Sequence, residues 1–220
     1  MELGLPEAIV RFVVSDPLGG GERVLEKQSC KEYLLDDVET AIYGVADAVG
    51  PVSDPAAAAG ESRVEVRVWS REGVRASLHL CAETVLRIAA TSAAFDFDLQ
   101  PMASVEEPEE PFEKDEVNDN PAPKPELTVV FIGDPPDTGI EQVIATASRA
   151  LYSVDGLEAC IKEVIEAAHH TIQGDVASWK PEIGVRLLSF RGIPPSLYLP
   201  SKVVQAIASC GASVDFDPYV

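Results

Sequence analysis

Residues Ser77–Asp98, SLHLCAETVLRIAATSAAFDFD, recur near the C-terminus as Ser196–Asp217, SLYLPSKVVQAIASCGASVDFD. The two copies are separated by a constant offset of 119 residues. Carried towards the N-terminus without a gap, the same offset aligns Phe12 with Phe131. Of 96 aligned pairs 30 are identical, whereas unrelated sequences of ordinary composition would share about 7. The pattern therefore predicts a tandem duplication.

The duplication divides the chain of 220 residues into two units and a connection. Residues 1–101 hold the first repeat and residues 125–220 the second. Residues 102–124 between them are rich in proline and carry eight acidic residues against two lysines. This composition is typical of an extended or disordered linker. Each repeat is close to the lower limit of common domain size.

Both repeats show the same succession of hydrophobic patterns. Alternating residues predict strands, and apolar residues at i, i+3, i+4 and i+7 predict amphipathic helices. The predicted strands are 6–17, 62–70, the short Ser-Leu-x-Leu segment and the closing segment that contains Asp-Phe-Asp, with their copies 119 residues later. The helical stripes cover 38–49 and 157–168, and a second helix follows each Ser-Leu-x-Leu segment. Residues 22–32 and 141–151 have weak periodicity, and the interpretation favours a second strand over a helix.

These elements predict an α+β fold. Each repeat is expected to be an open sheet of four or five strands with two helices on one face, close to a ferredoxin-like, split βαβ layout. The other face of each sheet is partly apolar, with Trp69 in the first repeat and Leu188 at the matching position. We expect these two faces either to cover each other as an internal pseudo-dimer or to frame a groove.

The formal net charge of −20 limits the classes of partner. It argues against nucleic acids and anionic membranes, because binding them requires a basic face. The negative charge would attract a basic protein partner. It could also have no role other than keeping the protein soluble. No apolar run is long enough to span a bilayer and the N-terminus does not resemble a secretory signal, so a cytosolic location is expected.

The repeated Asp-Phe-Asp segments supply the candidate site residues. On a strand, Asp96 and Asp98 share one face, as do Asp215 and Asp217. They could contact a basic partner, bind a divalent cation, or simply face solvent beside Arg67 and its copy. Trp69 is either a contact residue or buried at the seam between the repeats.

Catalytic and metal-binding patterns are missing from the sequence. It has no GxSxG, no HExxH and no phosphate-binding GK[ST] after the glycines at 19–21. The four cysteines are scattered without a CxxC pair, so neither a disulfide framework nor a zinc site is expected. We therefore expect no enzymatic activity, no cofactor and no metal. Acid–base catalysis by the four aspartates remains the enzymatic alternative.

The segment Ser196–Tyr219 resembles a bacterial family of domains of unknown function. The likeness rests on Ser-Leu-x-Leu, an amphipathic helix that ends in Gly-Ala-x-Val-Asp-x-Asp, and an aromatic residue after it. It is weaker in Ser77–Leu99, and an early Leu-Gly-x-x-Pro-Thr-like turn of the family is absent here. The resemblance implies a small α+β domain without known catalysis, in genomes where toxin–immunity loci are common.

Together these features favour a non-enzymatic, acidic protein-binding module. Its most concrete form is an immunity protein that neutralises a basic toxin enzyme. The alternative is a pair of sensor domains that binds a small ligand at the seam between the repeats.

Overall fold

The computed structural model describes residues 7–15, 21–30, 33–50, 61–70, 76–101, 127–136, 138–172, 174–188 and 196–219. The predicted linker, 102–124, lies outside these residues. Within them, no helix is both long and apolar enough to cross a membrane.

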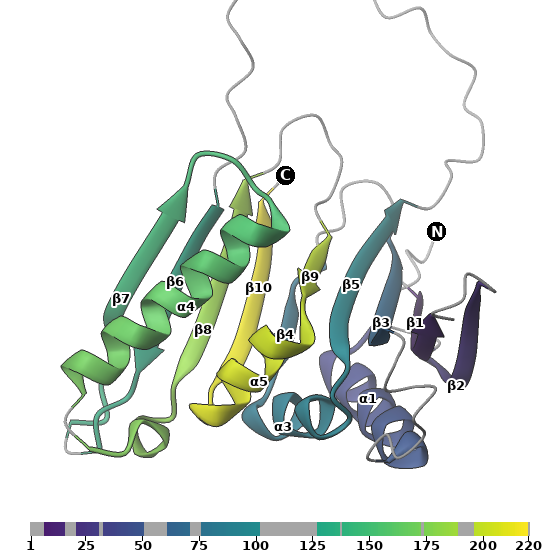
Figure 1. Cartoon of the computed structure of the whole chain (residues 1–220), viewed down its shortest axis with the longest axis horizontal. Coiled ribbons are helices and arrows are strands. Elements are labelled where there is room, and N and C mark those ends of the chain that lie inside the picture. The colour runs from purple at the N-terminus through teal and green to yellow at the C-terminus, as the bar shows by residue number, and fades with distance from the viewer. Residues whose placement is uncertain are drawn as a thin grey trace, which may run out of the picture.

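The two halves of the chain have nearly the same order of elements (Figure 1). The first half contains β1 (Glu7–Ser15), β2 (Glu22–Cys30), α1 (Leu35–Val49), β3 (Ser62–Ser70), β4 (Leu78–Leu80), α3 (Ala82–Ala90) and β5 (Ala94–Pro101). The second contains β6 (Leu127–Gly133), β7 (Gln142–Arg149), α4 (Val154–Thr171), the short 3₁₀ helix η1 (Val176–Trp179), β8 (Glu182–Leu188), β9 (Leu197–Leu199), α5 (Ser201–Ser209) and β10 (Ser213–Tyr219).

The segments of weak periodicity are strands, as the sequence favoured. β2 and β7 each lie at the edge of a sheet, and most of their side chains are exposed or half-buried. A strand in that position buries little on either face, so its sequence carries only a faint alternation. The helix η1 was not predicted.

The fold is α+β, with two mixed sheets of five strands each. Among the described residues, each half runs strand–strand–helix–strand–strand–helix–strand, and the second half has η1 in addition after its first helix. A ferredoxin-like domain runs strand–helix–strand–strand–helix–strand, so the extra strand after β1, and after β6, sets the observed order apart. In the first sheet β1 and β3 are antiparallel and β3 and β5 are parallel. The second sheet repeats this arrangement with β6 and β8 antiparallel and β8 and β10 parallel.

Each sheet takes its fifth strand from the other half of the chain. The first sheet has the order β2-β1-β3-β5-β9, and the second has the order β4-β10-β8-β6-β7. β9 pairs antiparallel with β5, and β4 pairs antiparallel with β10 in the equivalent register. In Figure 1, β9 lies beside β5 although more than ninety residues separate them in the chain. The two halves are thus interlocked by reciprocal strand exchange.

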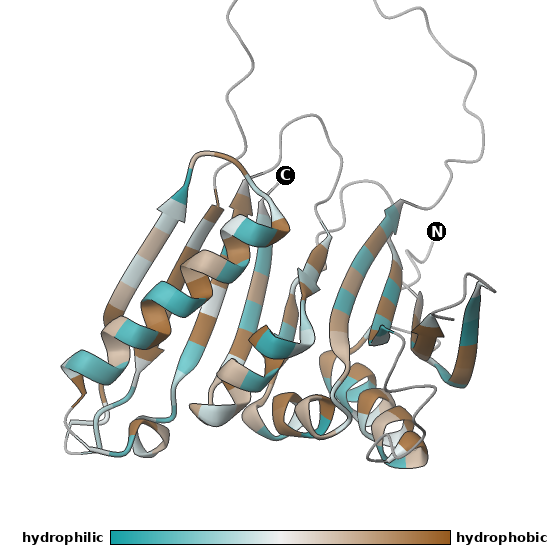
Figure 2. Ribbon diagram, viewed as in Figure 1, coloured by the Kyte–Doolittle hydropathy of each residue, from teal (hydrophilic) through white to brown (hydrophobic). Residues whose placement is uncertain are grey.

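Helices cover one face of each sheet, and we call the opposite face the outer face. The strands alternate between apolar and polar residues, and the helices carry an apolar stripe (Figure 2). The buried side chains of both halves belong to one continuous hydrophobic core. At its centre, the rings of Phe97 on β5 and Phe216 on β10 meet edge to face, with centroids 5.8 Å apart.

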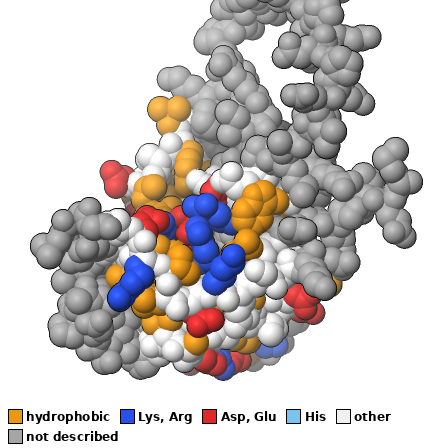
Figure 3. Space-filling view, turned by 90° about the vertical axis from the view of Figure 1, so that its right-hand side faces the viewer, with side chains coloured by type: hydrophobic (Ala, Val, Ile, Leu, Met, Phe, Trp, Pro, Cys, Tyr) orange, Lys and Arg blue, Asp and Glu red, His pale blue; other side chains and the backbone are white. Residues whose placement is uncertain are grey.

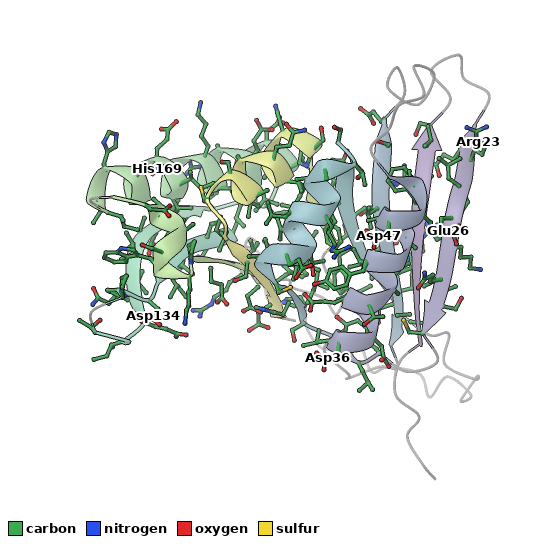
Figure 4. The ribbon with its side chains drawn as sticks, turned by 90° about the horizontal axis from the view of Figure 1, so that it is seen from below. Arg23, Glu26, Asp36, Asp47, Asp134 and His169 are labelled. Atoms are coloured by element: carbon green, nitrogen blue, oxygen red, sulfur yellow. The ribbon has the colours of Figure 1, made fainter. Side chains whose placement is uncertain are left out.

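The seam between the halves differs from the predicted contact of two sheet faces. It consists of the exchanged strands, the Phe97–Phe216 contact and the packing of α3 against α5. Seen from below in Figure 4, these two helices lie between the two sheets. The outer faces do not contribute to this seam, because their alternating charged side chains could not be buried against each other without a large desolvation cost.

Candidate functional site

The four predicted aspartates lie on the outer faces of two different sheets. Asp96 and Asp98 are on β5 in the first sheet, and Asp215 and Asp217 are on β10 in the second. All four are half-buried. The structure therefore brings them together as two pairs in equivalent positions, not as one group of four.

On the outer face of the first sheet, carboxylates are neutralised by arginines. Glu65 on β3 is 1% exposed, and both of its oxygens lie 2.7 Å from Nη2 of Arg11 on β1. Arg67, two residues along β3, also donates to Glu65. A carboxylate this deeply buried is tolerated only when charged donors surround it in this way.

Arg63 extends this network to the neighbouring strands. One of its Nη atoms lies 2.8 Å from Glu22 on β2, and its Nε lies 3.7 Å from Asp96 on β5. Burial and the nearby Glu65 carboxylate raise the pKa of Asp96, while Arg63 partly opposes that shift. The first outer face is therefore close to electrically balanced.

The second sheet lacks the residues that balance the charges of the first. By strand register, Gly184 occupies the place of Glu65, and Val130 that of Arg11. A Cβ built on Gly184 would lie 2.8 Å from Cγ2 of Val130, so the valine side chain closes over the glycine. The position equivalent to Arg63 holds Glu182, which reverses the charge.

This leaves an excess of carboxylates, which we call the acidic strip: Glu141, Glu182, Asp215 and Asp217. Burial raises the pKa of Glu182, and the charges of Asp215 and Glu141 raise it further. Burial likewise raises the pKa of Asp215, with Asp217 adding to the effect. A cation supplied from outside would relieve this repulsion.

Two basic side chains of the described residues, Arg186 and His79, lie beside the acidic strip. Arg186 on β8 is exposed and lies beside Asp217 in register. His79 comes from the exchanged strand β4, where it lies opposite Asp215, and its Nδ1 is 4.0 Å from Glu182 Oε2. The first half of the chain therefore supplies a neighbour, His79, to an acidic strip whose carboxylates all come from the second half.

Trp69 lies away from the acidic strip. It is half-buried on β3, on the same outer face as Arg67 and the Asp96 pair. It is thus not buried at the seam, and it shares a surface with only one of the two aspartate pairs. Glu182 and His79, which lie near Asp215, were not among the candidate site residues predicted from the sequence. Glu182 could have been found by comparing the two repeats, because it is aligned with Arg63 and has the opposite charge.

The described residues contain neither a metal-binding cluster nor a disulfide. No group of three or more His, Cys, Asp or Glu residues among them is placed to hold a metal ion. All four cysteines are free thiols, with Cys160 and Cys210 buried. What the acidic strip can do chemically is attract and hold cationic groups.

Comparison of the chain with protein-family models, with curated proteins and with solved structures finds no match in any of the three.

The raised carboxyl pKa values predict a pH dependence of stability. Asp96, Glu182 and Asp215 bind protons more tightly in the folded chain than in the unfolded one. Their ionisation therefore costs stability at neutral pH, and this cost disappears as the pH falls through the folded pKa values towards the ordinary value near 4. We expect the thermal midpoint to rise as the pH is lowered from 7.5 towards the ordinary carboxyl value near 4. Differential scanning calorimetry across this range measures it.

The variant Glu182→Gln/Asp215→Asn separates this local effect from the repulsion of the whole acidic chain. It should raise stability at pH 7.5 and reduce the gain on acidification. An unchanged slope in the variant would contradict the assignment.

Proposed function

We propose that this chain is a non-enzymatic protein-binding module that holds a basic partner on the acidic strip of the second sheet. The observation that carries the proposal is the loss of charge balance between equivalent faces. In the first sheet three arginines neutralise the carboxylates, and in the second sheet Arg11 and Arg63 are replaced by Val130 and Glu182. A lysine or arginine of a partner would supply the missing charges.

The proposal includes a tandem duplication that forms an internal pseudo-dimer in the cytoplasm. Its support is the 30 identities in 96 aligned pairs, together with the matching registers of β1–β2 and β6–β7 and the bulge each pair has at the same point. After a duplication, one copy can keep a self-neutralised face while the other diverges. The acidic strip is then the diverged face.

The most specific form of this function is neutralisation of a basic toxin enzyme by an immunity protein. It rests on the acidic strip and on the resemblance of Ser196–Tyr219 to domains from genomes rich in toxin–immunity loci. Co-expression with the product of an adjacent gene tests this form. A neighbouring protein that is harmless alone, and that does not co-purify at low salt, would rule it out.

The wider proposal is tested by titrating a decalysine peptide into the intact chain at low and at physiological salt. Asp215→Asn/Asp217→Asn should weaken binding by about tenfold or more, because two contacting carboxylates are lost. The matched control is Asp36→Asn/Asp47→Asn, which removes the same charge from exposed positions on α1. Equal losses in both variants would indicate attraction to net charge alone and contradict a site on the second sheet.

The sensor alternative has no comparable support. At the described centre of the seam, Phe97 and Phe216 pack edge to face, with no polar group between the rings to orient a ligand.

A further inference from the structure

The two edge strands of the protein differ in how they are protected. β2 is the last strand of the first sheet and β7 is the last strand of the second. Among the described strands, neither has a pairing partner along its free edge. An unpaired edge exposes backbone N–H and C=O groups that can pair with another chain. Natural edge strands usually avoid such pairing by carrying charged side chains.

β2 carries this protection. Its sequence, ERVLEKQSC, contains Glu22, Arg23, Glu26 and Lys27. Arg23 and Glu26 project from β2 at the margin of the molecule in Figure 4. Figure 3, which looks at the side where β2 lies, shows Lys, Arg, Asp and Glu side chains interspersed with hydrophobic ones. A second strand that approached this edge would have to desolvate these charges.

β7 has lost the protection at the same positions. By their pairing with β1 and β6, Gln142 matches Arg23, Ala145 matches Glu26 and Thr146 matches Lys27. From Gln142 to Ser148 the strand has no charged residue.

Exposed apolar side chains gather around the same strand. Val143 on β7 is 64% exposed, and Ile140 just before it is 66% exposed. Leu151, two residues after the strand, is 52% exposed, and Val154 opens α4 at 36%. Four other exposed hydrophobic residues of the described ranges lie around β2, between positions 24 and 35, but they are only 38–45% exposed. The three most exposed ones, Ile140, Val143 and Leu151, all lie around β7, and this greater exposure favours β7 as the interaction surface.

From these observations we propose that β7 pairs antiparallel with β7 of a second copy of this chain. A second copy fits because the two ends of β7 are complementary in charge: in an antiparallel pair, Glu141 just before the strand in one copy can lie beside Arg149 at the end of the strand in the other. Two chains of net charge −20 repel each other, so they can associate only where contact places no like charges opposite one another. The uncharged stretch of β7 meets this condition, and β2 does not.

The geometry of the pairing follows from symmetry. Two identical antiparallel strands are related by a twofold axis perpendicular to the sheet. The second sheets of both copies then form one continuous sheet, with α4 of each copy on the same side and the two outer faces on the other. This inference does not depend on the proposed function, although it would place two acidic strips on one surface.

Sedimentation velocity of the intact chain at about 5–100 µM tests the proposal. We expect a species of twice the 23.5 kDa chain mass at the upper end of this range. Val143→Lys/Thr146→Lys should be monomeric throughout, which corresponds to weakening by about 100-fold or more. The single variant Thr146→Lys should fold, because β2 already carries Lys27 at the matching position. It should also weaken the dimer.

The matched control is Val24→Lys, at the position equivalent to Val143; with Lys27 already at the position equivalent to Thr146, it gives β2 the same two lysines as the β7 double variant. It should leave the dimer intact. A wild-type chain that stays monomeric at every concentration overturns the proposal. So does a dimer that survives the β7 substitutions, or one that Val24→Lys dissociates equally well.

Discussion

Replacing Leu78 and Leu80 with alanine is expected to lower the free energy of unfolding by roughly 5 kcal/mol or more, because each buried Leu→Ala change costs about 2–5 kcal/mol. Both side chains are at most 1% exposed. These residues form β4, which pairs with β10 at the opposite end of the chain. The loosening should therefore appear in residues 213–219. Chemical denaturation measures the loss, and amide hydrogen exchange locates it.

The matched variant Leu197→Ala/Leu199→Ala truncates the other exchanged strand, β9. Its leucines are equally buried, and its pairing partner is β5 in the first half. It should increase exchange in residues 94–101. If the β4 variant instead loosened β5 and left β10 protected, each half would have kept its own short strand and the interlocked arrangement would be wrong.

Most of the local structure could be predicted from the sequence, because its hydrophobic periods are strong. The stripe that begins at Val38 is the buried face of α1, and the alternation in residues 62–70 is β3. The Asp-Phe-Asp segment is a strand with Phe97 fully buried and its aspartates on the outer face. In each case one face is buried against a single core, which forces one period on the sequence.

The strand exchange could not be predicted, and the repeat itself explains why. β4 and β9 are both Leu-x-Leu, and their leucines are buried to the same extent. Either strand would place the same two side chains at the edge of either sheet. The local sequence is therefore equally satisfied with and without exchange, and only the path of the whole chain distinguishes the two.

The candidate site was predicted only in part, for a related reason. Asp215 and Asp217 were predicted because they are identical in the two repeats. The net charge of the outer face of the second sheet, however, depends on positions where the repeats differ. Glu182 replaces an arginine and Gly184 replaces Glu65. Whether such a difference matters depends on which neighbours share the face, and this requires the register of three strands.

Glu65→Gly is expected to destabilise the protein by about 3–5 kcal/mol, the usual cost of removing one partner of a buried ion pair. Arg11 and Arg63 would lose their shared counter-charge while 23% and 18% exposed. The Nε atoms of both arginines are already buried without a hydrogen-bond partner. Urea denaturation at constant pH measures the loss.

The double variant Glu65→Gly/Arg11→Val gives the first sheet the pair that the second sheet already has, Gly184 and Val130. Because the valine removes the uncompensated charge and closes over the glycine as it does there, the double variant should be about 2 kcal/mol more stable than Glu65→Gly alone, within the range of coupling between contacting residues. Arg11→Val alone should be destabilising, since Glu65 would keep only Arg67 and the more distant Arg63. A double variant no more stable than Glu65→Gly would mean that the two residues are not energetically coupled. The charge asymmetry between the sheets would then need a cause other than the replacement of one matched pair by another.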